Sequence, residues 1–230
     1  MAIIKAKAQQ TTSVSRVSEG NDVYIRALRD GSLSTAGLFQ ALAIEGRMFQ
    51  ATVGTLTGPS TFASTAIDGT EPDLIVEVPA GTTILPVSLQ IYMEAYGTNA
   101  IFECLASYGT GGSKGAATGG TAVTPVNLRS DGPYGSACTV YSTINDATAT
   151  YVTGNIVEFW RDGAQVAITK ATAVNNIANA DFVKFEWSVA KYGFQPVLVG
   201  ASQLFVNAMS QAGTGFMKLV YAELPSAAIV

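Results

Sequence analysis

The stretch Val78-Pro79-Ala80-Gly81-Thr82-Thr83-Ile84-Leu85-Pro86-Val87-Ser88-Leu89-Gln90-Ile91-Tyr92-Met93-Glu94 decides the fold. A Pro-Ala-Gly turn opens it. Apolar side chains at positions 87, 89, 91 and 93 then alternate with more polar ones at 88, 90, 92 and 94. A two-residue period is typical of a strand with one face buried in an antiparallel sheet. The stretch therefore predicts a half-buried strand around which the rest of the chain is organised.

Similar short runs lie on both sides of this strand. We predict further strands at residues 47–56, 74–78, 100–108, 121–128, 137–144, 155–161, 182–189, 196–199, 203–209 and 215–224. Turn signals separate them, including Ser130-Asp131-Gly132-Pro133 and the hairpin-type pair Asp162-Gly163. Residues 32–46 fit either a short helix capped by Ser34 or an alternating strand. Short strands without the spacing of βαβ units indicate an all-β sandwich or barrel.

The composition indicates a surface that is covered by other subunits. Charged residues make up 13% of the 230 residues, against about a quarter in an average soluble protein. Hydrophobic residues make up 48%, yet no run approaches the roughly 18 apolar residues that cross a bilayer. We therefore expect neighbouring subunits to cover much of the exterior. The alternative is a monomer with an unusually uncharged surface.

The charges are few and unevenly placed. The net charge is −4, which argues against a nucleic-acid-binding protein. Residues 1–30 carry five basic and three acidic side chains, whereas residues 48–113 carry no basic residue. We predict that residues 1–60 form an N-terminal arm that contacts neighbouring subunits and that residues 61–230 form the sandwich. The first residues lack the apolar core of a secretory signal, so we expect cytoplasmic synthesis.

Several motifs for chemistry are missing. The chain has no histidine, which removes the commonest general acid or base and the usual nucleophile triads and zinc sites. A disulfide between Cys104 and Cys138 requires neighbouring strands, and we favour two buried free thiols. In the run Gly109-Thr110-Gly111-Gly112-Ser113-Lys114-Gly115, the lysine is not followed by the Ser or Thr of a phosphate loop. We interpret this run as a loop between strands.

Carboxylates and tryptophans leave functional alternatives open. The glutamates at 94, 103, 158 and 186 are candidates for a glycosidase pair, but each falls on the polar side of a predicted strand, and we favour solvated carboxylates. The acidic cluster Asp68, Glu71, Asp73 and Glu77 lacks the spacing of a calcium loop, and we favour a solvated loop. For Trp160 and Trp187 we favour core or interface packing over a sugar-binding platform. We therefore predict no catalytic residue, no cofactor and no metal site.

Four segments resemble known virion proteins: Val76-Glu77-Val78-Pro79-Ala80-Gly81-Thr82-Thr83-Ile84-Leu85-Pro86, Gly120-Thr121-Ala122-Val123-Thr124-Pro125-Val126-Asn127-Leu128-Arg129-Ser130, Pro196-Val197-Leu198-Val199-Gly200 and Gly215-Phe216-Met217-Lys218-Leu219-Val220-Tyr221-Ala222-Glu223. The first is similar to the entry to the core strands of viral jelly-roll proteins, and the others to stretches of tailed-phage virion proteins. The likeness covers roughly residues 70–225. It implies a single jelly roll of two antiparallel four-stranded sheets, commonly clustered as trimers on a capsid, without catalysis.

The sequence thus predicts a non-enzymatic phage virion protein that forms or decorates the capsid shell. Its expected partners are further copies of itself, as a trimer, and other capsid proteins, with no sequence-specific nucleic-acid contact and no membrane span. Its expected location is the virion. The alternative function is a carbohydrate- or receptor-binding module of a viral fibre or a cell surface. A glycan-active enzyme is a third hypothesis, which requires two carboxylates facing each other across a groove.

Overall fold

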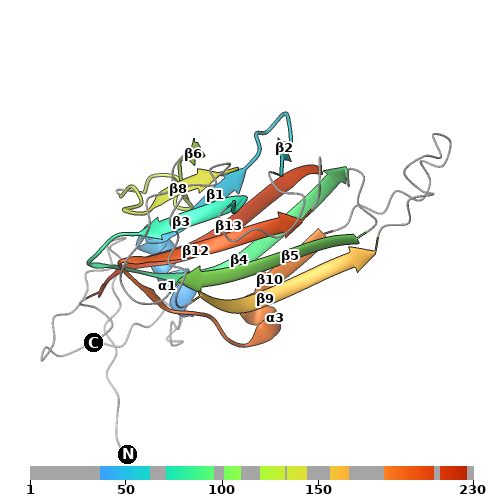
Figure 1. The fold of residues 1–230 in the computed structure, drawn as a ribbon. Helices are drawn as coiled ribbons and strands as arrows, with labels where there is room; N and C mark the ends of the chain where they lie inside the picture. The colour runs from blue at the N-terminus through green and yellow to red at the C-terminus, as the bar shows by residue number, and fades with distance from the viewer. Residues whose placement is uncertain are drawn as a thin grey trace, which may run out of the picture.

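The computed structural model of the chain describes residues 37–62, 71–95, 101–109, 120–132, 134–143, 156–165, 184–209 and 213–226 (Figure 1). In chain order the elements are α1 (Leu38–Ile44), β1 (Met48–Val53), β2 (Ser60–Thr61), β3 (Leu74–Val78), β4 (Thr82–Ala95), β5 (Ile101–Gly109), β6 (Thr121–Val123), β7 (Val126–Asn127), β8 (Thr139–Ser142), β9 (Ile156–Gln165), β10 (Lys184–Ser188), α3 (Val189–Tyr192), β11 (Leu198–Val199), β12 (Ser202–Met209) and β13 (Thr214–Pro225).

Two antiparallel sheets form a sandwich-like arrangement, as Figure 1 shows. The first has seven strands in the order β10-β4-β13-β1-β7, with β11 also paired to β4 and β2 to β13. The second has six strands in the order β6-β8-β3-β12-β5-β9. The predicted all-β sandwich is thus confirmed. The sheets differ from the predicted four strands apiece, because short strands such as β2, β6, β7 and β11 extend them.

The strand predicted from residues 78–94 is the longest of the seven-stranded sheet. β4 runs for 14 residues and pairs along its length with β13. Its apolar positions Leu89, Ile91 and Met93 are buried, while Tyr92 and Glu94 are exposed. From Leu89 to Glu94 this is the predicted alternation, because successive side chains of a strand point to opposite faces. Val87 differs from the prediction: it packs with Leu85 on the outer face, since the register with β13 shifts between Val220 and Tyr221. Gly81 has a φ of 83°, a conformation that glycine adopts without strain, and so completes the turn into β4.

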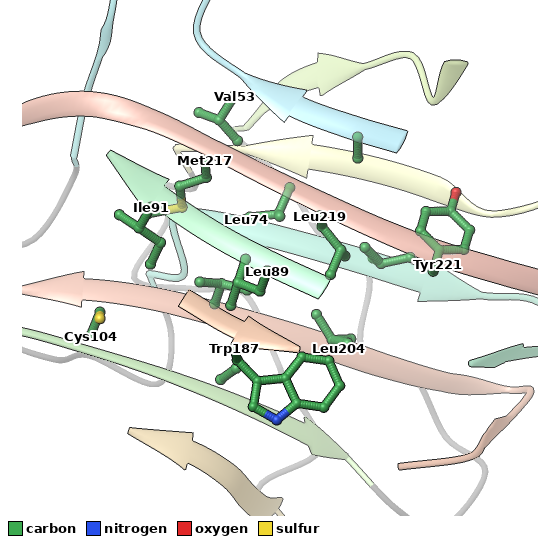
Figure 2. Packing of buried hydrophobic residues seen from close by; sticks show 14 of the residues in the cluster. Val53, Leu74, Leu89, Ile91, Cys104, Trp187, Leu204, Met217, Leu219 and Tyr221 are labelled. Atoms are coloured by element: carbon green, nitrogen blue, oxygen red, sulfur yellow. The ribbon is translucent and has the colours of Figure 1, made fainter. Parts of the chain in front are cut away.

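The core fills the space between the two sheets. Figure 2 shows Leu89, Trp187 and Leu219 of the seven-stranded sheet packed towards Leu74 and Leu204 of the six-stranded sheet. All five are at most 1% exposed. Interlocked apolar side chains from two inner faces are the usual core of a β-sandwich. The main stabilisation of the fold therefore comes from apolar surface removed from water between the sheets.

A second, smaller cluster lies on the outer face of the seven-stranded sheet. There α1 places Leu42 against Met48 and Leu85, together with Ala222 and Leu224. The helix ends at Ile44 and is followed by Gly46, whose φ is 74°, with hydrogen bonds from Gly46 N to Ala43 O (3.0 Å) and from Arg47 N to Leu42 O (2.9 Å). This is a Schellman ending, which favours glycine. Of the two alternatives for residues 32–46, the helix is therefore the one observed over 38–44.

The start of α1 differs from the prediction. Gly37 occupies the N-cap position and makes no side-chain capping bond, while Ser34 lies outside the described residues. Packing of Leu42 against the sheet stabilises this short helix in the absence of a cap, as is usual for helices of seven residues.

Two of the chain's crossings between the sheets fall at or next to strands that the sequence predicts. The predicted strand 121–128 is divided at Thr124-Pro125, so that β6 lies in the six-stranded sheet and β7 in the seven-stranded sheet. Likewise β11 and β12 belong to different sheets and are separated at Gly200, between the strands predicted at 196–199 and 203–209. A Cβ atom on Gly200 would lie 1.9 Å from the carbonyl oxygen of Pro79. Only glycine therefore fits at this crossing.

The expected hairpin turn at Asp162-Gly163 is wrong. β9 continues through both residues, which pair with Cys104 and Glu103 of β5. A Cβ atom on Gly163 would lie 2.9 Å from the carbonyl oxygen of Phe102. The glycine thus permits close approach of two strands, which is a second common reason for glycine inside a strand.

The fold also begins before the predicted boundary at residue 60. β1 lies between β13 and β7 inside the seven-stranded sheet, so residues 48–53 belong to the sandwich. Residues 1–36 lie outside the described residues, as does the predicted loop at 109–115 except for Gly109. Within the described residues, no helix is both long enough and apolar enough to span a membrane.

Candidate functional site

The four candidate glutamates do not gather at one site in the described part of the chain. Glu103 of β5 and Glu158 of β9 both pair with Arg161, and the Glu158 Oε2 atom lies 2.6 Å from its Nη2 atom. Hydrogen bonds from Arg161 hold the pKa of Glu158 below its usual value. A glycosidase acid needs a raised pKa instead. Glu103 and Glu158 are therefore both ion-pair partners of Arg161, one from the neighbouring strand β5 and one from the same strand β9.

The other two glutamates lie on the seven-stranded sheet. Glu186 of β10 accepts a hydrogen bond from Gln90 (3.0 Å) and pairs with Lys184 at 2.9 Å. These two partners, Lys184 first, lower the pKa of Glu186. Glu94 is an exposed residue of β4.

The predicted acidic loop is partly buried, which corrects the expectation of a solvated cluster. Asp73 and Glu77 are 1% and 6% exposed, whereas Asp68 lies outside the described residues. The Asp73 Oδ2 atom accepts a hydrogen bond from the backbone N–H of Ala208 at 2.7 Å, and Gln203 donates to Glu77 at 3.4 Å. A buried carboxylate needs hydrogen-bond donors, and β12 supplies them to both acids. Asp73, just before β3, and Glu77, within β3, therefore link this part of the chain to β12. Among the described residues, no three His, Cys, Asp or Glu side chains are placed to hold a metal ion.

Sequence reasoning missed a polar cluster centred on Ser136. Its hydroxyl lies 2.8 Å from the Tyr221 hydroxyl and donates a hydrogen bond of 2.8 Å to Glu223. The same carboxylate accepts the backbone N–H of Ala137 at 3.0 Å. Burial is the main cause of a raised pKa for Tyr221, whose hydroxyl therefore stays protonated. These hydrogen bonds hold residues 136 and 137, just before β8, against β13 in the middle of the seven-stranded sheet. Ser136 is 85 and 87 residues away from Tyr221 and Glu223 in the sequence, so no local sequence pattern could identify the cluster.

We expect Glu223→Ala to lower the free energy of unfolding by about 1–3 kcal/mol, because it leaves the Ala137 N–H and the Ser136 hydroxyl without their acceptor. Glu158→Ala is the matched control, since it removes an exposed ion pair worth about 0–1 kcal/mol. Urea unfolding of the two variants beside the unmodified chain measures both values. Equal losses in the two variants would show that the Ser136 cluster does not fasten the segment.

The cysteines are free and buried, as the sequence favours. Burial is the largest cause of a raised pKa at both thiols. The carboxylate of Asp162 adds to it at Cys104, and that of Glu223 at Cys138. A thiol must ionise to act as a nucleophile, so neither has the environment of a reactive cysteine.

We therefore expect both thiols to resist an aromatic disulfide reagent in the folded protein and to react promptly in denaturant. Absorbance of the released thiolate measures the number of thiols that react. Rapid labelling of either cysteine without denaturant would contradict the buried positions.

The two tryptophans lie in the core, which confirms the expected packing over a sugar platform. Trp160 and Trp187 are 3% and 0% exposed. Trp160 donates a hydrogen bond of 3.2 Å to the hydroxyl of Tyr192, and the Trp187 ring lies edge-on to Phe159 with centroids 5.2 Å apart.

Exposed apolar side chains gather at one edge of the seven-stranded sheet. Beyond β4, the segment that follows β10 carries Tyr192, Phe194, Val197 and Val199, which are 38%, 51%, 48% and 53% exposed. We call these four residues the edge strip. The rings of Tyr192 and Phe194 contact each other with centroids 6.5 Å apart. Four large apolar side chains exposed within eight residues are unusual on a monomer surface that faces only water.

A second apolar surface lies at the opposite edge, where β7 ends the sheet. It consists of Ile44, Val126, Leu128 and Tyr134, which are 48%, 63%, 45% and 54% exposed, and we call it the α1–β7 patch. Asn127 holds the patch together: its side chain donates to the carbonyls of Gly46 (2.8 Å) and Tyr134 (3.1 Å). The sequence pattern does not single out either surface, because an exposed valine and a buried one look alike in sequence.

The geometry thus offers two apolar surfaces on one sheet, within the described residues. No protein-family model, curated protein or solved structure matches the chain.

Proposed function

We propose that this chain is a non-enzymatic structural protein of a phage virion, a jelly roll that forms or decorates the capsid shell through contacts between subunits. The edge strip and the α1–β7 patch carry the proposal. Exposed apolar patches commonly mark contacts between proteins, and further copies of the chain are natural partners for them. The resemblance of residues 70–225 to jelly-roll virion proteins supports the same function. Between the two roles we favour decoration, because residues 1–36 carry only five basic side chains, too few to manage a packaged genome.

The positions of the two surfaces favour a ring. They are different surfaces at opposite edges of one sheet, so the edge strip of one subunit meets the α1–β7 patch of the next in a head-to-tail contact. Such contacts produce a closed ring when the rotation per subunit closes, and a trimer is the ring we propose. Residues 1–36 then extend over adjacent subunits and add to the contact between them.

Light scattering of the full chain and of residues 37–230 tests this function. The truncation begins at residue 37, because removing residues 1–60 would also remove β1 from the sheet. We expect the full chain to form trimers or larger assemblies, and the shorter chain to stay folded and assemble less extensively. A full chain that remains monomeric would contradict the proposal.

One observation favours a carbohydrate-binding module as the second candidate. On the outer face of the seven-stranded sheet, Phe216 of β13, Tyr92 of β4 and Lys184 of β10 form a row across three strands. The Lys184 Nζ atom lies 5.5 Å from the centre of the Tyr92 ring, which is 38% exposed. The Gln90–Glu186 pair lies two positions along the same strands. An aromatic ring beside polar side chains suits the flat face of a sugar. A glycan array, probed in the presence and in the absence of calcium, compares the unmodified chain with Tyr92→Ala. Binding by the unmodified chain that is lost in Tyr92→Ala would favour this candidate.

A further inference from the structure

A groove opens between the two sheets next to the α1–β7 patch. It has a volume of about 460 Å³ and lies between the turn that joins β1 to β2 and the strand β6. Its lining side chains are mostly hydroxyls and amides, among them Gln50, Thr52, Ser60, Thr121, Thr124 and Thr143. None of the described residues that line it is charged or aromatic. The groove therefore suits a neutral, hydrogen-bonding ligand.

Strand edges are available along two sides of this groove. β7 pairs with β1 only at Phe49 and Gln50, and among the described residues no strand continues the sheet on that side as far as Val53. Within the same residues β6 pairs with β8 alone and ends the six-stranded sheet. An uncovered edge presents backbone N–H and C=O groups that pair readily with an added strand. An extended peptide is thus the neutral ligand that the groove fits, through main-chain hydrogen bonds.

We propose that the groove binds residues 8–15 of a second copy of this chain as an added strand. This segment, Ala8-Gln9-Gln10-Thr11-Thr12-Ser13-Val14-Ser15, has no charge, as the groove has none. Lys7 and Arg16 flank it, and the acidic excess of the chain lies outside residues 1–36. The two flanking cations therefore approach a body of opposite net charge.

The length of the preceding chain and the position of the groove favour a neighbouring subunit. The 22 residues from Ser15 to Gly37 span up to about 70 Å when extended, which is longer than a domain of this size is wide. Val126 belongs both to the groove lining and to the α1–β7 patch. A neighbouring subunit that binds at that patch through its edge strip has its own Gly37 at the far edge of its sheet, beside its α1. The chain before Gly37 is long enough to run back across that subunit to the groove. This inference rests on the proposed function for the presence of a neighbouring subunit.

Disulfide trapping between full-length chains tests the proposal. One chain carries Thr12→Cys and the other Thr124→Cys, which places a thiol in the groove. Thr139→Cys is the matched control, because Thr139 is an exposed threonine of β8 that does not line the groove. After mixing and mild oxidation, peptide mass spectrometry measures the disulfide between position 12 and the second site. We expect at least about tenfold more of it with Thr124→Cys than with the control, because binding raises the effective concentration. Equal yields with the two sites would overturn the proposal.

A single chain with both Thr12→Cys and Thr124→Cys decides which copy fills the groove. Equal amounts of this variant with light and with heavy isotopes are mixed before oxidation, so that the peptide masses report whether a disulfide joins two chains. Disulfides that join light to heavy chains support the proposal, and disulfides confined to one chain overturn it. If light scattering finds assemblies but the trapping yields are equal, the groove inference fails and the proposed function stands. If the full chain is monomeric, both fail.

Discussion

Replacing Trp187 with alanine is expected to lower the free energy of unfolding by about 3–5 kcal/mol. The indole is fully buried between the two sheets, on the short strand β10 (Figure 2). Its ring lies edge-on to that of Phe159. The two sheets are each held in place by many hydrogen-bonded strand pairs, so they cannot move together to fill the space that the indole leaves. A cavity therefore remains, and its cost adds to the lost burial of the ring.

Two variants make this prediction specific. Trp187→Phe keeps most of the buried volume and also removes the indole N–H, which has no hydrogen-bond partner among the described residues, so it should cost clearly less than alanine. Leu56→Ala removes a side chain that is fully exposed and should change stability by no more than about 0.5 kcal/mol. Denaturant unfolding followed by tryptophan fluorescence and circular dichroism measures all three. A loss near that of Leu56→Ala would mean that Trp187 does not lie in the core.

The second large effect is expected for self-association. The double substitution Phe194→Asp and Val197→Asp places two charges in the edge strip, and we expect it to weaken the subunit contact by about 100-fold or more. The reason is that a carboxylate buried in an apolar contact loses its hydration without gaining a partner. Because both residues are about half exposed in the folded chain, the free energy of unfolding should change little.

Leu56→Asp is the control for this substitution. Leu56 is as apolar as the residues of the edge strip and is fully exposed, but it belongs to neither apolar surface. Sedimentation velocity should show smaller species for the double variant and unchanged assembly for the control. If both variants assemble like the unmodified chain, the edge strip is not the contact.

The strands that the sequence predicts best are those whose alternation is uninterrupted. β4 from Leu89 to Met93 and β13 from Met217 to Tyr221 keep apolar residues on the inner face, and the core between the sheets requires that pattern. Beyond the register shift between Val220 and Tyr221, the buried residues Leu85, Ala222 and Leu224 lie on the outer face. By contrast, the strand predicted at 121–128 divides at Pro125, since its two halves pair with different sheets. Which sheet a short strand joins depends on long-range pairing, which a local pattern does not contain.

Polar residues are harder to place for the same reason. Asp73 and Glu77 look like part of a solvated loop in the sequence, yet they are buried because β12 supplies donors from more than 120 residues away. The glycine of Asp162-Gly163 indicates a turn, although its function is close contact with β5. The two apolar surfaces can likewise be identified only from the structure. The sequence shows that apolar residues are common, but it does not show which of them are exposed.

The boundary predicted at residue 60 assigns the strand predicted at 47–56 to the arm. Residues 48–53 alternate, and their apolar members Phe49, Ala51 and Val53 reach the core. Any N-terminal arm that contacts other subunits must therefore be sought before residue 37.

Sedimentation velocity of the unmodified full-length chain over a concentration series is the most direct test of covered apolar surfaces. The account predicts a discrete species at a multiple of 23.9 kDa, with a trimer as the expected ring, that persists on dilution into the micromolar range. A single monomeric species at every concentration up to about 1 mM would contradict it, because contacts weaker than that could not build a shell.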